Sequence, residues 1–259
     1  MPTLVTAEDT NRAGRVVGDQ SPRHAERRSG FATHSRTVLA VSGFVMLGFV
    51  VLHLAGNLVA FAGSATFNAY ARSLRQIGTP LVGEGVLLWL ARVVLAAALI
   101  LHLAAHASLL LHPAGAASEE QPGGEPARGD SAQYCPMPPW YATLPLEWLL
   151  VTGGLIAVFV AFHLAQLTIG ATHPAFVPDD AYRNMVMALG SWPVSIAYIA
   201  AAVAVGAHLL PGIWTGMRSL GLIRPTTEAL AASLSVAVPL VLVLGMSAVP
   251  VAVLIGVLR

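Results

Sequence analysis

The chain has 259 residues, of which 56% are hydrophobic and only 10% are charged. Soluble globular domains carry about 25% charged residues, so this composition argues against a water-soluble fold and favours a membrane protein. The formal net charge of +1 provides no basic field for binding nucleic acid. The single cysteine, Cys135, excludes an internal disulfide and a four-thiolate zinc or iron–sulfur site built by this chain alone.

The N-terminal segment, residues 1–36, contains six arginines and four acidic residues and shows no apolar periodicity. This composition is typical of segments that cannot bury enough apolar surface to fold. The first apolar run begins only at Thr37, which is too late for an ordinary secretory signal peptide. We therefore expect residues 1–36 to form a disordered basic tail.

Five apolar segments follow, each long enough for the about 20 residues that a membrane-spanning helix needs. They cover residues 37–62, 84–111, 145–171, 191–217 and 229–257. The sequence therefore predicts an all-α membrane protein, a five-helix bundle that forms a single domain over residues 37–259. In hydrocarbon a helix satisfies all of its own backbone hydrogen bonds.

The sequence also predicts the structure of two connections between the spans. The segment at about 113–143 is rich in Pro, Gly and acidic residues, as is typical of a flexible polar loop. Residues 67–75 are expected to form a short helix at the membrane surface, with Phe67, Tyr70 and Leu74 on one side. Pro80 then breaks the chain before the second span.

Arginine placement predicts the orientation, because basic residues next to spans are retained in the cytoplasm. With the N-terminus inside, nine arginines lie in inner segments and four in outer segments. The odd number of spans places the C-terminus on the opposite side. We therefore expect a cytoplasmic N-terminus, a cytoplasmic 113–143 loop and an outer C-terminus.

Histidines inside the predicted spans are the main functional signal, because an ionisable group in hydrocarbon is costly. Counted at about 1.5 Å per residue, four of them lie about 24–27 Å from the start of their own spans. These are His53, His102, His163 and His208. Because successive spans run in opposite directions, His53 and His163 share the outer half of the bundle, and His102 and His208 share the inner half.

Two imidazoles at one depth, repeated at a second depth, match the axial ligands that two six-coordinate haems require. The alternative is that each histidine only hydrogen-bonds a neighbouring helix. His106 lies one turn from His102 on the same face, and we assign the ligand role to His102 because its depth matches that of His208. His106 remains a candidate for contact with a haem propionate.

Arg92 is an unusual residue for its depth, about 12 Å below the outer end of the second span. The sequence offers no acidic residue at the same level. A haem propionate or a quinone headgroup is the expected partner. The alternative is that Arg92 reaches toward the outer face or pairs with Glu84.

Five motifs together resemble a known family. They are HLAGN at 53–57, FNAYARSLR at 67–75, EGVLLWLARVVLAAALILHLAAH at 84–106, FHLAQLTIG at 162–170 and HLLPGIWTGMRSLG at 208–221. Their order and spacing resemble the single-chain, five-span cytochrome b anchor subunit of bacterial succinate dehydrogenases and fumarate reductases, particularly the actinobacterial form. The similarity covers about residues 37–222.

The resemblance implies an electron-transfer subunit of succinate:quinone oxidoreductase, the respiratory complex II, in the bacterial plasma membrane. Flavoprotein and iron–sulfur subunits would dock on its cytoplasmic side and oxidise succinate, which this chain cannot do itself. His53 and His163 would ligate the distal b-type haem, and His102 and His208 the proximal one. The electrons would pass to a quinone, expected to be menaquinone. Some relatives lack haem or hold another metal centre, so a haem-free anchor, or one with a metal centre shared with another subunit, is the alternative.

Two places could bind the quinone, which needs hydrogen-bond donors near a haem and access from the bilayer. The outer candidates are Asn57, Tyr70, Arg72 and Glu84, with Glu84 as a proton relay. The inner candidates are Arg36, Ser42, Trp214 and Arg218. We favour the outer site, because electron transfer through two haems requires an acceptor beyond the second.

Overall fold

The computed structural model describes residues 22–111, 147–172 and 175–259. Within these ranges the chain is almost entirely helical, and five helices are long and apolar enough to cross a membrane. The predicted all-α, five-helix membrane bundle is therefore confirmed. The polar loop expected at 113–143 lies outside the described residues, as do the first 21 residues of the expected tail.

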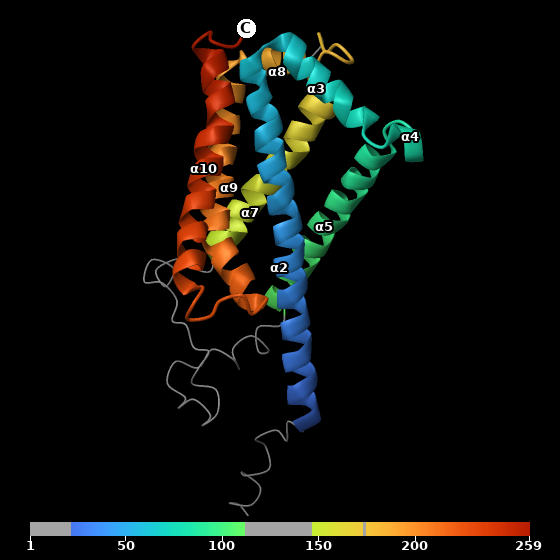
Figure 1. The fold of residues 1–259 in the computed structure, drawn as a ribbon. Coiled ribbons are helices and arrows are strands. Elements are labelled where there is room, and N and C mark those ends of the chain that lie inside the picture. Colours follow the sequence, from blue (N-terminus) through green and yellow to red (C-terminus); the bar gives the residue numbers. More distant parts are fainter. Residues whose placement is uncertain (1–21, 112–146, 173–174) are drawn as a thin grey trace, which may run out of the picture.

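The five long helices alternate in direction along the bundle (Figure 1). They are α2 (Pro22–Leu58), α5 (Val86–Leu111), α7 (Glu147–His163), α9 (Trp192–Ser219) and α10 (Glu228–Leu254). Their bounds lie within a few residues of the predicted spans, except at the start of α2 and at the end of α7, where the helical chain continues as η4 (Leu164–Ile169). We call the end of the bundle that carries the C-terminus the α3 end, and the end that carries the connection between α9 and α10 the turn end (Figure 1).

The expected disorder of residues 1–36 is wrong for residues 22–36, because α2 is already helical from Pro22. Proline is favoured in the first turn of a helix, where its missing N–H leaves no bond unmade. The residues that follow include Ala, Glu and Arg, which have high helix propensity. Because they continue directly into an apolar helix, they extend it without a new nucleation step.

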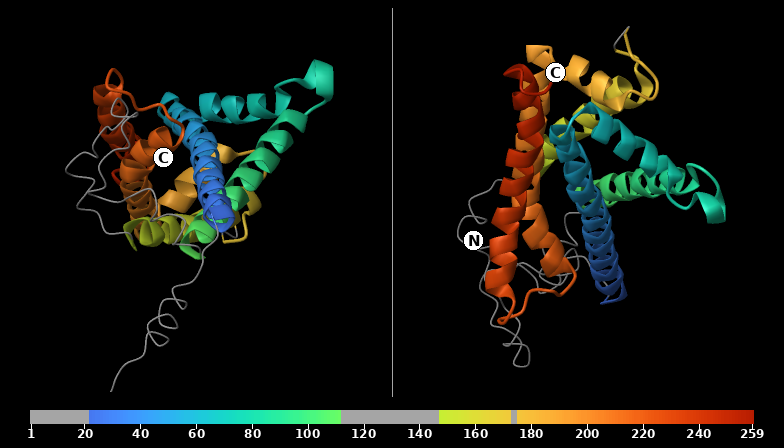
Figure 2. Two further views of the ribbon diagram at one scale, coloured as in Figure 1. Left: turned by 90° about the horizontal axis from the view of Figure 1, so that it is seen from below. Right: turned by 45° about the horizontal axis from the view of Figure 1, so that its top comes forward.

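Short helices cover the α3 end (Figure 2). They are η1 (Val59–Ala62), α3 (Ser64–Gln76), α4 (Thr79–Val82) and α8 (Ala181–Leu189). The helix predicted over 67–75 is thus confirmed as part of α3, and its position at the membrane surface stays a prediction. Its buried Phe67 packs edge-on against Tyr182 of α8, with ring centroids 6.1 Å apart. α8 is a nine-residue helix that begins after Asp180, and it was not predicted from the sequence.

Close packing of α9 against α10 forms one side of the bundle. A Cβ placed on Gly206 of α9 would lie 2.3 Å from Cγ2 of Val243, so only glycine allows this approach. Ala231 and Ser235 of α10 are fully buried in the same bundle. Small residues let membrane helices approach closely where no hydrophobic effect drives them together. In contrast, α5 leans away from the other helices toward the α3 end (Figures 1 and 2).

Candidate functional site: two pairs of histidines

The first pair of histidines lies near the α3 end. His53 of α2 faces His163 of α7, with ring centroids 5.7 Å apart and ring planes at 90°. Phe49, one turn before His53, stacks on its imidazole at 5.3 Å. The predicted juxtaposition of His53 and His163 is therefore observed.

The second pair lies deeper, toward the turn end. His102 of α5 faces His208 of α9, with ring centroids 6.3 Å apart and planes inclined by 59°. This juxtaposition was also predicted. Two imidazoles that each place a nitrogen about 2 Å from one metal ion have centroids roughly 6 Å apart, so both pairs have a spacing suited to one ion between them.

The number of ligands in each pair restricts the kind of metal site. Among the described residues, no group of three or more His, Cys, Asp or Glu side chains could hold a metal ion. Structural zinc sites need four protein ligands and catalytic sites usually need three. A haem supplies four ligands of its own and needs only two axial side chains. Opposed histidine pairs therefore fit a haem better than a free ion.

The hydrogen bonds of His102 determine which of its nitrogens carries the proton. Nδ1 lies 3.2 Å from the backbone oxygen of Leu39 and 3.2 Å from Oγ of Ser42. A carbonyl oxygen can only accept, so Nδ1 must be the protonated nitrogen. The Ser42 hydroxyl donates its own proton to the carbonyl of Val38, at 2.7 Å, and accepts from His102. The lone pair of Nε2 is therefore available to a metal.

His208 is held in the same way by a residue of α7. Its Nδ1 lies 3.1 Å from Oγ1 of Thr152. The Thr152 hydroxyl donates to the carbonyl of Trp148 at 2.7 Å, so it accepts from Nδ1–H of His208. Nε2 again keeps its lone pair. Metal-ligating histidines almost always donate their second ring N–H in this manner.

The hydrogen-bond partner of Nδ1 in His163 is a tyrosine, Tyr198. The Tyr198 hydroxyl donates to Oε1 of the buried Gln166 at 2.9 Å and lies 3.2 Å from Nδ1 of His163. Its single proton is used by Gln166, so the oxygen accepts from His163. Gln166 lies in the π-helix η4 (Leu164–Ile169), which continues α7 directly after His163. π-helical turns often occur at functional sites.

These hydrogen bonds also show how far apart the two histidine pairs lie along the helices. Because Ser42 and Thr152 each contact a histidine of the second pair, they mark its level on α2 and α7. The step from Ser42 to His53 and the step from Thr152 to His163 are both 11 residues, or about 16 Å along a helix. Planar groups centred at the two levels would have edges closer than this.

Glycines next to these hydroxyl residues complete the match between α2 and α7. A Cβ on Gly43 would lie 3.3 Å from Cε1 of His102, and a Cβ on Gly153 would lie 3.4 Å from Cε1 of His208. Each imidazole thus rests against helix backbone. The pairs Ser42–Gly43 and Thr152–Gly153 could have been found in the sequence, since each precedes an intramembrane histidine by the same interval. Of these residues, only Ser42 was predicted as a site residue, and in another role, as a quinone contact.

His106 and Arg92 are not among the residues that hydrogen-bond the two histidine pairs. Nε2 of His106 is buried and has no hydrogen-bond partner among the described residues. The Arg92 guanidinium lies over the Trp89 ring, with Cζ 4.8 Å from its centroid, and lines a pocket at the α3 end. Contact of either residue with a haem propionate stays a prediction.

The four outer quinone candidates do not come together as expected. The Tyr70 hydroxyl lies against Gly56, next to Asn57 on α2. Arg72 follows Tyr70 by two residues and therefore lies on another face of α3, where it lines the pocket with Arg92. Glu84 lies between α4 and α5, at the end of α3 farther from α2 (Figure 1). A straight α3 and an outward-leaning α5 cause this separation.

The inner quinone candidates are also divided. The Ser42 hydroxyl donates its only proton to the carbonyl of Val38 and accepts from His102, so it has no donor left for a quinone carbonyl. Trp214 is 1% exposed, and its Nε1 has no partner among the described residues. Arg218 is exposed in the last turn of α9, and Arg36 is partly buried on α2. A wholly apolar cavity of about 430 Å³ lies near this end, between α2, α9 and α10.

No protein-family model, curated protein or solved structure matches this chain. The arguments about its function therefore depend on the residues and on the geometry described above.

Proposed function

We propose that this chain is a membrane anchor and electron-transfer subunit of a succinate:quinone oxidoreductase in the bacterial plasma membrane. One observation carries the proposal: two opposed histidine pairs lie at two levels of one bundle, with ring centroids 5.7 Å and 6.3 Å apart. Hydrogen bonds leave Nε2 free as a ligand in His102, His163 and His208. The motif resemblance supports the same function.

In this proposal the four histidines would hold two b-type haems, one in each pair. A bound haem supplies a reversible one-electron centre. Ser42, Thr152 and Tyr198 hold the imidazoles in one tautomer and one orientation, and the apolar helices exclude water from both levels. The bundle thereby provides a fixed route of about 16 Å between its two levels.

Electrons would enter at the turn end, which the arginine distribution predicts to be cytoplasmic. A flavoprotein and an iron–sulfur subunit would dock there and supply electrons from succinate, as the motif resemblance implies. Arg36, Arg218 and Arg224 lie toward this end and would contact the partner or lipid headgroups. Electrons would then move from the His102–His208 level to the His53–His163 level.

The quinone, proposed to be menaquinone, would bind at the α3 end. The Tyr70 hydroxyl lies against Gly56 there, Asn57 is the next residue of α2 and follows His53 by one turn, and both side chains offer donors for a quinone carbonyl. The involvement of Ser42 with His102 disfavours the inner alternative. We leave Arg72 and Glu84 out of the proposed quinone site, because Arg72 lines the pocket with Arg92 and Glu84 lies between α4 and α5.

A second candidate function is a haem-free anchor, or one whose metal centre is shared with another subunit. The same hydrogen bonds favour it, since histidines held by Ser42, Thr152 and Tyr198 are also stable packing elements. The reduced-minus-oxidised absorption spectrum of the purified full chain separates the two functions. The proposal requires b-type bands from two haems, and a chain that takes up none when expressed with haem would contradict it.

A further inference from the structure

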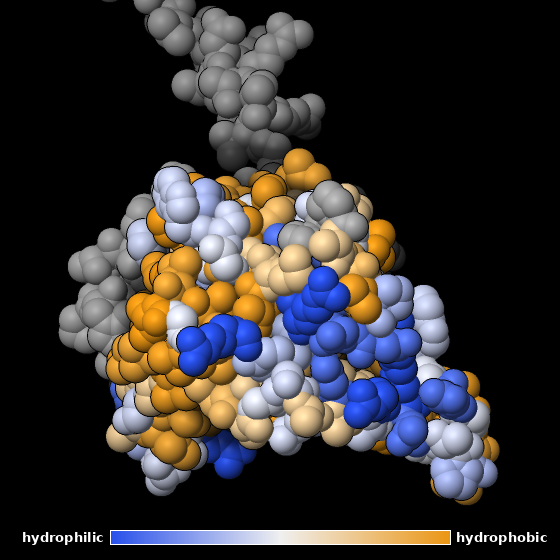
Figure 3. Space-filling model, turned by 90° about the horizontal axis from the view of Figure 1, so that it is seen from above, coloured by the Kyte–Doolittle hydropathy of each residue, from blue (hydrophilic) through white to orange (hydrophobic). Residues whose placement is uncertain are grey.

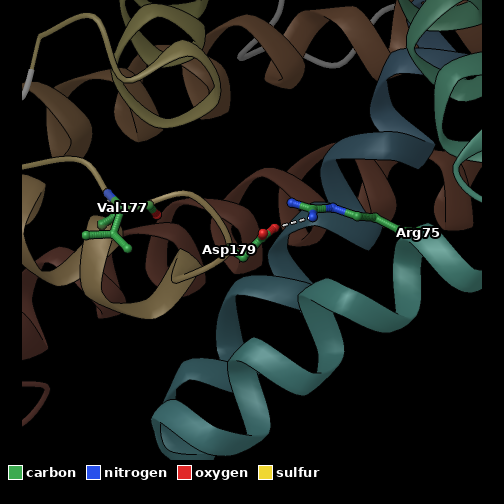
Figure 4. Close-up of polar contacts among 4 residues, drawn as sticks. Arg75, Val177 and Asp179 are labelled. Atoms are coloured by element: carbon green, nitrogen blue, oxygen red, sulfur yellow. Dashed lines mark hydrogen bonds and ion pairs between the residues drawn. The ribbon is translucent and has the colours of Figure 1, made fainter.

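A polar pocket of about 320 Å³ lies at the α3 end, apart from the contacts within the histidine pairs. Its walls come from α3, α5, η4 and the segment that leads into α8. Its charged residues are Arg72, Arg75, Arg92 and Asp179. Asp179 pairs with Arg75 (Figure 4), so the described lining keeps a surplus of two positive charges.

Hydrogen bonds hold the pocket walls in place before any ligand binds. Asn68 of α3 donates to Oδ1 of Asp180 at 2.9 Å and accepts from the backbone N–H of Tyr182 at 2.9 Å. Asn184 of α8 bonds both the N–H and the carbonyl of Val177, at 2.9 Å and 2.7 Å. The Asn184 carbonyl and one of its two amide N–H groups are thereby used. Thr168 also lines the pocket with a hydroxyl, but the guanidinium groups are its only cationic donors among the described lining residues.

Arg72 and Arg92 form no ion pair with an acidic side chain in the described part of the chain. Arg92 lies six residues into α5, about 9 Å below its start, and its long side chain can carry the charge back toward the surface. A guanidinium at this depth calls for an anionic partner. Two such groups in one pocket call for an anion with several oxygens.

The surroundings of the pocket indicate where such an anion comes from. Leu167, Phe176 and Pro178 supply apolar walls. Next to Arg92 on α5, the side chains of Trp89, Leu90 and Val93 are 55–64% exposed. The pocket therefore lies between a hydrophilic cap and an apolar side, and Figure 3 shows strongly hydrophilic residues gathered at this end beside apolar surface. Lipid headgroups occupy this level of a membrane.

We infer that the pocket binds the phosphodiester of an anionic phospholipid, with Arg72 and Arg92 as its cationic donors. Guanidinium forks match phosphate oxygens and can bind them bidentately. The acyl chains would run along the exposed apolar face of α5. The lipid would thus lie beside the outward-leaning α5. Its headgroup would contact α3 and α8 as well as α5.

The test measures lipid binding to the purified full chain in a neutral detergent, by native mass spectrometry and calorimetric titration. The probes are dioctanoyl phosphatidylglycerol, dioctanoyl phosphatidylcholine and inorganic phosphate. We expect phosphatidylglycerol to bind most tightly and its affinity to fall roughly tenfold in Arg72→Gln and in Arg92→Gln. The matched control is Arg183→Gln, which removes one exposed arginine of α8 outside the pocket and should change the affinity less than twofold.

Three results would overturn the inference. Equal binding of phosphatidylglycerol and inorganic phosphate would show a simple anion site. An equal loss in Arg183→Gln would show only the general charge of this end. Binding that disappears when the chain is loaded with haem would assign the arginines to a haem propionate. The assay needs neither bound haem nor electron transfer, so failure of the proposed function would leave its result intact.

Discussion

Ser42 on α2 and Thr152 on α7 occupy equivalent positions: each hydroxyl accepts a hydrogen bond from Nδ1 of a histidine on another helix. Each is followed by a glycine that contacts the same histidine, and each precedes an intramembrane histidine of its own helix by 11 residues. The helix pairs α2–α5 and α7–α9 therefore carry the same arrangement. This repetition makes the effects of single substitutions directly comparable.

Replacing Thr152 by valine should lower the affinity for the proposed haem between His102 and His208 more than replacing Ser42 by alanine does. Thr152→Val removes the acceptor for His208, whereas His102 keeps the carbonyl of Leu39 in Ser42→Ala. Loss of such a partner typically lowers metal affinity by about 10–100-fold. Loss of the acceptor also makes the histidine a less basic ligand, so the reduction potential of the proposed haem should rise. Haem content and redox titration measure both effects.

The control for these hydroxyl variants is Ser233→Ala. Ser233 is exposed on α10 and donates only to its own helix, to the carbonyl of Ala229 at 2.8 Å. It should leave haem content and potential unchanged. Equal losses in Ser42→Ala and Thr152→Val would contradict the assignment of Leu39 as a second acceptor.

Replacing His208 by alanine should remove one haem, and replacing His106 by alanine should leave both. His208 faces His102 at 6.3 Å, whereas Nε2 of His106 is buried without a partner in the described chain. Difference spectra of the two variants check this prediction. Loss of a haem from His106→Ala alone would show that His106 is the ligand from α5.

Substituting Tyr70 by phenylalanine should slow quinone reduction while both haem spectra remain. The hydroxyl that lies against Gly56 would no longer donate to a quinone carbonyl. Steady-state turnover with a soluble quinone analogue measures the effect. Tyr182→Phe, at the same end but packed against Phe67, is the control. Unchanged turnover in Tyr70→Phe would move the quinone site to the turn end.

Adding a methyl group at Gly206 should separate α9 from α10. The new Cβ would lie 2.3 Å from Cγ2 of Val243, and overpacking of this kind costs about 1–3 kcal/mol. Gly212→Ala is the matched control on the same helix, because its Cβ would meet no atom within 4 Å. Thermal unfolding in detergent should show a lower midpoint for the first variant only.

Acid should loosen the connection between α3 and α8. A hydrogen bond from Asn68, aided by the backbone N–H of Arg183, holds the pKa of Asp180 below its ordinary value. A carboxyl group with a lowered pKa in the folded state stabilises the fold above its unfolded pKa of about 4. This contribution disappears as the pH falls further, through the folded value. Unfolding curves between neutral pH and about pH 3 should therefore show a smaller acid loss in Asp180→Asn than in the unaltered chain.

Length and hydropathy sufficed to predict the five spans, because the bilayer imposes one requirement on every crossing segment. Histidine depth sufficed to pair His53 with His163 and His102 with His208, since spans that alternate in direction convert residue counts into levels. Side-chain direction was less predictable. The separation of Tyr70 from Arg72, and the distance from Asn57 to Glu84, depend on how α3 lies across the bundle and on the lean of α5. Neither leaves a periodic signal in the sequence.

The helix pairing within the two histidine pairs has a consequence for biogenesis. His53 and His163 come from the first and third spans, and His102 and His208 from the second and fourth. A nascent chain released as far as α7 can complete only the first pair, and the second must wait for α9. The interlocked order means that neither site can be assembled from one hairpin inserted alone, whereas α10, which carries no histidine, is inserted after both ligand sets are complete.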